Sequence, residues 1–369
     1  MRSKDKSNSL EERLYSLDFF RGFTMFLLIA EFTALFSLLV SPKLEGTIIY
    51  SIGTQFHHVP WEGLHFWDLI QPFFMFIVGV AIPYSYSNRL KKGQSQKQIT
   101  WHVVKRAFLL LFLGWALYYN GPGEGAFRFQ NVLAQLSVTY LIAYLIMNKS
   151  VLTQIIISIA LLLFTELIYR GFSVEGFDQA FVPNKNFGTW LDLQYGGADL
   201  NGNWVSFNAV PTTAHTIWGV LTGQLLMGSR TKNQKLKILV ISGFTGIIIG
   251  YALSPVTPII KHIATSSFVL VSGGFTLLTL AFSYWLIDIK KIKGWTLFFA
   301  IVGMNPLFIY LFAHIGGAEF ISRIIHPFTL TLFGWMGNLT ADILTSMVVI
   351  FLLWYICYWF YKKKIFIKL

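Results

Sequence analysis

The stretch FWDLIQPFFMFIVGVAIPYSYS, residues 66–87, decides the fold class of this chain. After Asp68 near its start it carries no charged side chain. An α-helix rises about 1.5 Å per residue, so a stretch of this length crosses the ~30 Å hydrocarbon core of a bilayer. Lipid offers no hydrogen-bond partners, so a segment that crosses it must satisfy its own backbone as a helix.

Similar apolar blocks recur along the whole chain. We therefore predict an all-α fold, a single polytopic transmembrane helix bundle over residues 1–369. Its spans, about ten in number, are expected near residues 19–41, 66–87, 106–120, 129–147, 151–169, 212–228, 236–253, 266–288, 295–314 and 340–361. The region 316–339 contains Arg323, His326 and Pro327, and we predict a loop of interfacial or re-entrant character there.

The bulk composition agrees with a membrane protein. Hydrophobic residues make up 54% of the chain and charged residues only 12%, whereas soluble domains carry about a quarter charged residues. A net charge of +12 in a soluble protein would suggest nucleic acid as a partner. Here the charge lies in short segments between spans, so we expect a lipid bilayer and no nucleic acid. Cys357 is the single cysteine, which excludes a disulfide framework within one chain.

The distribution of basic residues predicts the orientation. Placing both termini in the cytoplasm puts most of the 29 Lys and Arg residues on the inner side, as the positive-inside rule requires. The basic residues then predicted on the outer side are Lys43, Arg128, Arg170, Lys185, Lys261 and Arg323. The main outer segments are 42–65 and 170–211. The second is a long loop region rich in Trp, Gly and Asp, and loops of that length are often functional.

Ionisable residues inside spans are costly and usually face the bundle interior, a partner or a water-filled cavity. The set consists of Asp18, Arg21, Glu31, Asp68, Glu166, His215, His314 and Asp342, with Asn131, Gln135 and Asn305 as neutral companions. Glu31 lies in the middle of the first predicted span. It could bind an ammonium substrate, couple protons, or be a carboxyl held neutral or paired with another helix.

Other members of this set have plain structural explanations. Asp18 and Arg21 share one helix face at i and i+3, so they form an ion pair or leave Arg21 for an anionic ligand. Asp68 could simply cap its helix, where the helix dipole favours a carboxylate. Arg106 could extend toward lipid head groups.

The densest polar cluster lies at the predicted outer mouth of the second span. It contains His57, His58 and His65 together with Glu62 and Asp68. Histidine can act as a neutral base or a charged acid near pH 7, and burial at the membrane edge favours the neutral form that a base needs. The spacing fits no metal-ligand pattern, so we expect no metal.

Six ordered blocks resemble the heparan-α-glucosaminide N-acetyltransferase family. They are RLYSLDFFRG (residues 13–22), FHHVPWEGLHFWDLIQPFFMFIVG (56–79), KRAFLLLFLG from Lys105, NVLAQLSVTYLIAYL from Asn131, PVTPIIKHIATSSFVL from Pro255 and GMNPLFIY from Gly303. The blocks extend over nearly the whole chain. Related bacterial proteins are often described as N-acetylglucosamine-related transporters.

The resemblance implies transfer of the acetyl group of cytoplasmic acetyl-CoA across the membrane to the amine of a glucosamine-type sugar. The family's active histidine corresponds to His58, which would act as a base or carry the acetyl group, and Asp68 is assigned to the same catalytic unit. An asparagine of the family falls near Glu31 or Phe32 here, which leaves the acceptor open.

The remaining site residues are assigned on the same basis. Glu31, Trp61 and Asn305 are expected to contact the substrate. Coenzyme A is expected to contact Arg21, Lys105 and Arg106 through its phosphates, with Asn131 and Gln135 also assigned to the cofactor.

Two other functions stay open at this point. One is a carrier that moves amino sugars inward, although the sequence contains no evident inverted repeat. The other is an O-acyltransferase acting on an envelope glycan. In each case we expect a multi-pass protein of the bacterial cytoplasmic membrane with His58 near the outer side. The sequence leaves the oligomeric state open, a homodimer included.

Overall fold

The computed structural model describes residues 14–118, 128–195 and 197–367. The basic residues Arg2, Lys4, Lys6, Arg13 and Lys368, which enter the orientation prediction, lie outside these ranges. Within the described ranges the chain is helical and forms no β-strand, apart from one isolated antiparallel bridge between Glu62 and Ile260. The predicted all-α class is therefore confirmed.

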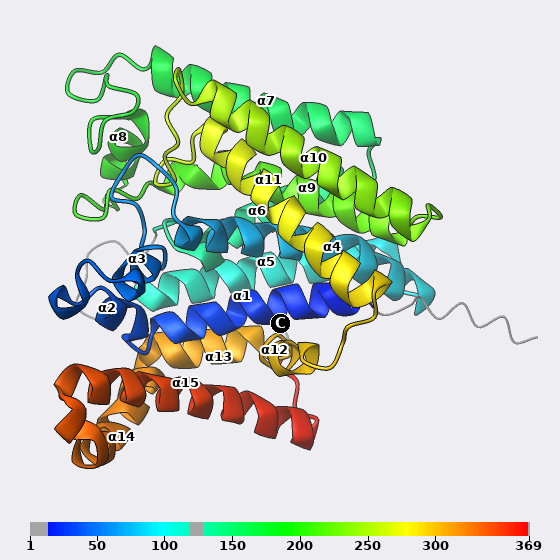
Figure 1. Ribbon diagram of the computed structural model, residues 1–369. Coiled ribbons are helices and arrows are strands. Elements are labelled where there is room, and N and C mark those ends of the chain that lie inside the picture. Colours follow the sequence, from blue (N-terminus) through cyan, green and yellow to red (C-terminus); the bar gives the residue numbers. More distant parts are fainter. Residues whose placement is uncertain (1–13, 119–127, 196, 368–369) are drawn as a thin grey trace, which may run out of the picture.

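The helices run side by side across the molecule, and the short helices α2, α3 and α8 gather at one end of the long ones (Figure 1). Their bounds are α1 Tyr15–Glu31, α2 Leu35–Leu39, α3 Ile48–Thr54, α4 Ile70–Lys91, α5 Gln96–Tyr118, α6 Val132–Ile146, α7 Val151–Gly171, α8 Phe187–Gln194, α9 Ala209–Met227, α10 Lys232–Leu253, α11 Ser266–Ser283, α12 Thr296–Val302, α13 Pro306–Phe312, α14 Ala318–Phe333 and α15 Asn338–Lys363.

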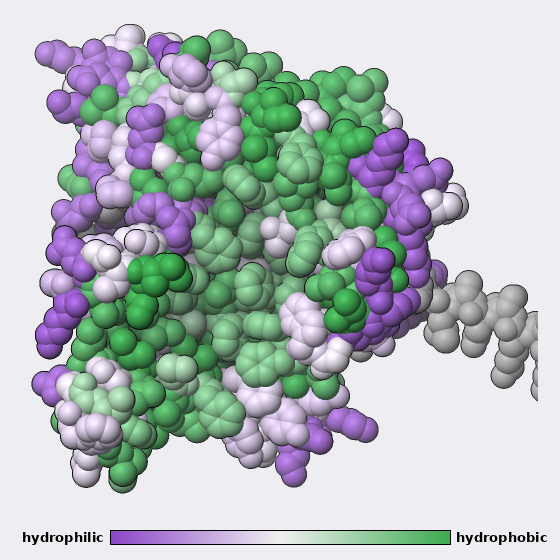
Figure 2. All heavy atoms as spheres, in the orientation of Figure 1, coloured by the Kyte–Doolittle hydropathy of each residue, from purple (hydrophilic) through white to green (hydrophobic). Residues whose placement is uncertain are grey.

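The protein has the build of a multi-pass membrane protein. Seven helical segments of the described chain are long and apolar enough to cross a bilayer: Phe66–Lys91, Gln96–Tyr118, Val151–Gly171, Lys232–Leu253, Ser266–Ile289, Pro306–Met336 and Asn338–Lys363. Figure 2 shows a broad hydrophobic belt between two hydrophilic edges, as expected for a body surrounded by lipid. A span count of ten and the orientation stay predictions.

The first predicted span, 19–41, is not one helix. Helix α1 begins at Tyr15 and ends at Glu31, and Ala34 adopts a left-handed backbone conformation with φ of 62° before the short α2. A left-handed residue cannot continue a right-handed helix. Glu31 therefore lies at the end of α1 and not in the middle of a span, which corrects the prediction.

Three other boundaries differ from the predicted ones. The segment 295–314 divides into α12 and α13, because Pro306 lacks the N–H group that a continuous helix would need. The region predicted as a loop, 316–339, contains helix α14, which follows a left-handed Gly316 with φ of 99°.

Helix α5 begins at Gln96, well before the predicted residue 106. The reason is a reciprocal cap: the Ser95 N–H donates to Gln98 Oε1 at 2.8 Å and the Gln98 N–H donates to Ser95 Oγ at 3.3 Å. Lys105 and Arg106 therefore lie well inside a helix and do not begin one.

Small residues let α4 and α9 approach each other closely, which fixes the helix that follows Asp68. A Cβ atom added to Gly79 would lie 2.1 Å from the backbone oxygen of Thr216, and one added to Gly219 would lie 2.2 Å from that of Phe76. Such contacts require glycine on both helices, as is common where membrane helices pack.

Candidate active site

Two loops meet at one end of the bundle and form the framework of the site. The Gly63 N–H donates to the Ile259 carbonyl at 2.8 Å beside the Glu62–Ile260 bridge. Gly63 has φ of 126°, a conformation that favours glycine, so the chain can turn there and pair. The Asn208 side chain donates to the Lys261 carbonyl at 3.0 Å. These contacts place Lys261 beside the loop that carries His58.

His58 and Asp68 form a hydrogen-bonded pair. Nδ1 of His58 lies 2.7 Å from Oδ1 of Asp68, and the other carboxylate oxygen accepts the His65 N–H at 2.8 Å. Asp68 is 1% exposed, and an ionised carboxylate can only accept hydrogen bonds. Nδ1 of His58 must therefore carry the proton. This leaves the lone pair on Nε2, which has no bonding partner among the described residues.

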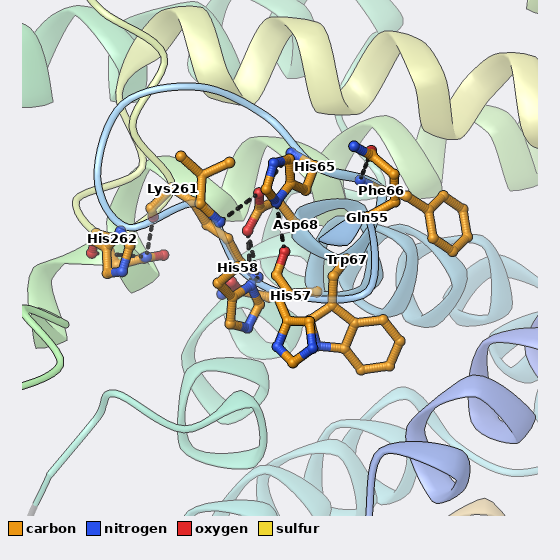
Figure 3. Close-up of polar contacts among 12 residues, drawn as sticks. Gln55, His57, His58, His65, Phe66, Trp67, Asp68, Lys261 and His262 are labelled. Carbon is orange, nitrogen blue, oxygen red and sulfur yellow. Dashed lines mark hydrogen bonds and ion pairs between the residues drawn. The ribbon is translucent and has the colours of Figure 1, made fainter. Parts of the chain in front are cut away.

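Lys261 completes a three-residue cluster with this pair. Its Nζ lies 3.1 Å from Nδ1 of His58 and 3.6 Å from Oδ1 of Asp68, although Lys261 is distant in sequence from both. Figure 3 shows His58 and Lys261 converging on the Asp68 carboxylate. The Lys261 ammonium also lies 5.3 Å from the centre of the Trp204 ring, within cation–π range.

Burial and the charges of neighbouring residues shift the pKa values of the basic side chains in these loops. Burial lowers the pKa of His58, and the positive charge of Lys261 lowers it further, against the opposing effect of Asp68. Burial lowers the pKa of Lys261 to about 8, while the Asp68 and Glu31 carboxylates oppose the shift. The pKa of His262 is lowered to about 4, again by burial first and then by the positive charge of Lys261. The His58 imidazole is therefore expected to be neutral near pH 7.

A cavity of about 260 Å³ lies beside the cluster. Its lining includes the polar residues Glu31, His58, Gln71, Lys261, Tyr310 and His314, and the apolar residues Leu28, Phe32, Trp67, Ile70 and Val132. Trp67 donates from Nε1 to Oε1 of Glu31 at 3.2 Å, which orients that carboxylate. A mixed lining of this kind suits a small polar ligand with an apolar face, such as a sugar.

Two tryptophan rings lie beside the cluster, Trp204 from the segment 170–211 and Trp61 from the segment 42–65. The Trp204 ring lies 5.3 Å from the His58 ring and 4.1 Å from the His262 ring. Trp61, predicted to contact substrate, stacks on His262 at 5.4 Å and donates from Nε1 to the Phe181 carbonyl at 2.7 Å. Trp61 does not line the cavity. The structure places it behind His262, in contrast to its predicted contact with substrate.

The other two histidines of the predicted cluster hold the backbone. Nε2 of His57 lies 3.1 Å from the Phe36 carbonyl oxygen, and Nδ1 of His65 lies 2.9 Å from that of His57. The described residues contain no group of three or more His, Cys, Asp or Glu side chains arranged to hold a metal ion.

Asn305 lies apart from the cavity, in contrast to its predicted contact with substrate. Its Nδ2 donates to the Ile365 carbonyl at 3.0 Å, and its Oδ1 accepts the Ile367 N–H at 2.7 Å. Both halves of the amide are thus occupied by the C-terminal segment. The sequence alone could not show this, because the contact joins residues far apart in the chain.

The residues assigned to coenzyme A are placed in two groups. Arg21 pairs with Asp18 at 3.0 Å, which is the structural alternative raised from the sequence, and Lys105 is exposed. The Arg106 guanidinium lies 5.1 Å from the centre of the Tyr140 ring, and its buried Nε has no hydrogen-bond partner among the described residues.

Asn131 and Gln135 lie on α6 near the cavity. Asn131 caps the helix by accepting the Ala134 N–H at 2.9 Å and donates to the Gly114 carbonyl. The Gln135 side chain bonds to that of Gln71, which lines the cavity. Gln135 therefore supports the cavity wall from behind.

Gln71, Trp204 and Lys261 are among the residues at the cluster and its cavity that were not predicted as site residues. Two features of the sequence could have drawn attention to Lys261. It is one of the few basic residues on the predicted outer side, and it lies in the block PVTPIIKHIATSSFVL. Neither signal shows which residue it contacts, because its partner His58 is 203 positions away in the sequence.

Comparison with known proteins gives partial matches. No protein-family model matches the chain. Human heparan-alpha-glucosaminide N-acetyltransferase is 30% identical over 142 residues, which cover 37% of this chain and 19% of the human protein. The mouse protein of the same name is 36% identical over 92 residues, 24% of this chain and 14% of the mouse protein. The matches thus span less than a fifth of each relative's length. They show a distant relationship between this multi-pass membrane protein and the N-acetyltransferases.

Proposed function

We propose that this protein is a membrane-embedded N-acetyltransferase that moves the acetyl group of acetyl-CoA to the amine of a glucosamine-type sugar. The observation that carries the proposal is the His58–Asp68 pair, whose 2.7 Å hydrogen bond leaves Nε2 of His58 available beside a polar cavity. The distant relationship to N-acetyltransferases supports the same reaction class.

His58 acts as the general base in this proposal. An amine attacks a carbonyl carbon through its lone pair and must lose a proton in doing so, and Nε2 of His58 accepts that proton. Asp68 holds Nδ1–H and stabilises the imidazolium that forms. His58 then returns the proton to the sulfur as the C–S bond breaks. The products are the acetamido sugar and free CoA.

The acceptor binds in the cavity, where Glu31 faces the same space as His58. A carboxylate at this position can bind the ammonium form in which an amino sugar arrives near pH 7. The ammonium must give one proton to solvent before its nitrogen lone pair can attack. Trp67 and Phe32 supply apolar surface for the sugar ring. A cavity of about 260 Å³ takes a small acceptor more readily than a polymer.

Acetyl-CoA, when bound, supplies an activated thioester. The cavity is too small for the whole coenzyme, so the nucleotide would lie outside it, with Lys105, Arg106 and Arg21 as phosphate contacts at the predicted inner side. The unpartnered Nε of Arg106 fits this role, because guanidinium groups bind phosphate well. The predicted setting is the bacterial cytoplasmic membrane, with His58 near the outer side.

The first prediction concerns His58. Purified protein in detergent, given acetyl-CoA and glucosamine, should release free CoA, and His58→Ala should reduce the release by roughly 10²–10⁴-fold because no base remains. Acetyl-CoA binding should stay within about twofold, since the imidazole contacts the reacting end alone. His326→Ala, a change in a partly buried histidine on α14 that contacts Asp342 outside the cavity, serves as the control.

The same assay separates the other functions. A carrier of amino sugars would release no CoA under any condition, and an O-acyltransferase would not respond to glucosamine. Turnover of His58→Ala at the wild-type rate would refute the role of His58.

A further inference from the structure

The Lys261 ammonium has more hydrogen-bond donors than the protein provides acceptors for. It is 5% exposed and carries three N–H groups. The described structure gives its Nζ one hydrogen-bond-range neighbour, Nδ1 of His58 at 3.1 Å. That nitrogen already donates to Asp68 at 2.7 Å, so it has no lone pair left to accept from Lys261.

The remaining contacts of Lys261 are electrostatic. The nearest carboxylate oxygen, on Asp68, is 3.6 Å away, and the face of Trp204 is 5.3 Å away. Leaving N–H donors of a buried charged group unpaired is costly, so they are expected to have a partner when the protein works. Lys261 lines the same cavity as His58, and this is where such a partner can bind.

We propose that Lys261 is a further catalytic residue, which donates a hydrogen bond to the acetyl carbonyl oxygen as the acceptor amine attacks. The inference rests on the proposed acetyltransferase function and deepens it. As the amine nitrogen bonds to the carbonyl carbon, the C=O electron pair moves to oxygen and His58 takes the amine proton. Lys261 stabilises the negative oxygen until the C–S bond breaks and His58 gives its proton to the sulfur.

The position of Lys261 suits this role for a physical reason. A preformed positive charge in a dry site needs no reorganisation during the reaction, so it stabilises a developing oxyanion far better than water does. The backbone of Lys261 is held by Asn208, and its ammonium is held by Asp68 and the Trp204 face. The same pKa of about 8 keeps most of the Lys261 side chain protonated near pH 7.

The second prediction is that Lys261→Met lowers kcat by about 10²–10³-fold, the usual effect of removing one oxyanion donor. Methionine keeps the length and apolar body of the side chain but lacks its charge and donors. The KM for glucosamine should change less than kcat, since the hydrogen bond strengthens only in the transition state. Lys185→Met, at an exposed lysine of the loop that also carries Trp204, is the matched control.

A chemical rescue distinguishes a catalytic role of the Lys261 ammonium from a role of the side chain in folding. Lys261→Cys treated with 2-bromoethylamine regains a side chain of lysine length with a terminal ammonium, because the thiol sulfur displaces bromide. Position 261 lines the cavity, whereas Cys357 is fully buried and does not, so the reagent should reach the introduced thiol and spare Cys357. Activity should return in the treated Lys261→Cys protein and not in treated Lys261→Met.

A binding measurement tests the carbonyl contact without turnover. One probe is an acetyl-CoA analogue with a methylene in place of the sulfur, which keeps the carbonyl; the other is ethyl-CoA, which lacks it. Wild-type protein should bind the carbonyl-bearing probe more tightly, and Lys261→Met should bind the two alike. The His58→Ala protein should keep the wild-type preference.

The outcomes separate the two claims. Absence of glucosamine-dependent CoA release in wild-type protein refutes the proposed function itself. If wild-type protein is active while Lys261→Met keeps the wild-type kcat and the preference for the carbonyl probe, the role of Lys261 is refuted and the acetyltransferase assignment stands. If mass spectrometry shows that the introduced thiol of a folded Lys261→Cys protein is alkylated and activity still does not return, the role of Lys261 is likewise refuted.

Discussion

At the scale of residues, the site consists of a base, its orienting carboxylate and a cation. Asp68 is the only anion of the three and contacts both of the others, with 2.7 Å to His58 and 3.6 Å to Lys261. It fixes the tautomer of the histidine and compensates the charge of the lysine. Two basic groups are thereby kept close together in a partly buried site, where burial first and then the positive charge of Lys261 lower the pKa of His58.

The third prediction concerns the dependence of kcat on pH at saturating substrates. His58 must be neutral to accept a proton, so activity falls at low pH, with a midpoint below the ordinary histidine value of 6.5 because burial and Lys261 lower its pKa. Lys261 must be protonated, so activity also falls at high pH, with a midpoint near 8. The profile should be bell-shaped.

The Lys261→Met variant tests the direction in which Lys261 shifts the pKa of His58. Removing this positive charge makes the imidazolium form of His58 easier to reach, so the acid midpoint should rise. The alkaline decrease should disappear, because no ammonium is left to titrate. The other charges facing these groups, namely Asp68, Glu31, His57 and His262, are unchanged in the variant. An acid midpoint that stays in place would contradict the electrostatic coupling.

Local sequence was sufficient for part of this site. His58 and Asp68 are ten positions apart in one block and could be assigned together, and the structure joins them directly. Lys261 belongs to a loop between two other helices, and only the folded chain brings it to the pair. Asn305 shows the converse, since a polar residue beside a helix break binds the C-terminal segment and not the cavity.

At the scale of elements, the breaks between helices matter more for the site than the helices do. Glu31 reaches the cavity because α1 ends there, and Tyr310 reaches it from α13, which begins anew at Pro306. Hydropathy predicts the apolar segments well but does not register such breaks, since Ala34 and Phe32 are as apolar as their neighbours. Ser95 and Gln98 have the spacing of a reciprocal helix cap, which the predicted start at residue 106 did not take into account.

The fourth prediction tests the close packing of α4, the helix that follows Asp68, against α9. Gly79→Ala places a methyl carbon 2.1 Å from the Thr216 backbone oxygen, so the two helices must separate. Overpacking of this kind typically costs about 1–3 kcal/mol. The thermal midpoint in detergent, followed by intrinsic fluorescence, should fall by several degrees.

The control for this packing is another glycine-to-alanine change in a helix. A Cβ atom added to Gly171, at the end of α7, meets nothing within 4 Å, so Gly171→Ala should leave the midpoint close to wild type. Equal midpoints for Gly79→Ala and the wild type would show that α4 and α9 are not packed backbone to backbone.

At the scale of the whole molecule, composition was enough to identify a polytopic helical membrane protein. Figure 2 shows the hydrophobic belt that the apolar blocks predict, and Figure 1 shows the helices that form it. Composition could not give the pairing of helices or the meeting of the two site loops, because the contacts that set them join segments far apart in sequence. The cavity at the end of the bundle is a product of that pairing.

The central claim is that a thioester brought from the predicted inner side reaches Nε2 of His58. The fifth prediction is the most direct test, a structure determined by electron cryo-microscopy with CoA bound. The sulfur should lie at the cavity, about 3–5 Å from Nε2 of His58, near the spacing that group transfer requires. The phosphates should lie toward Arg106 and Lys105. A CoA thiol directed away from the cavity, with His58 many ångströms from the sulfur, would contradict the account.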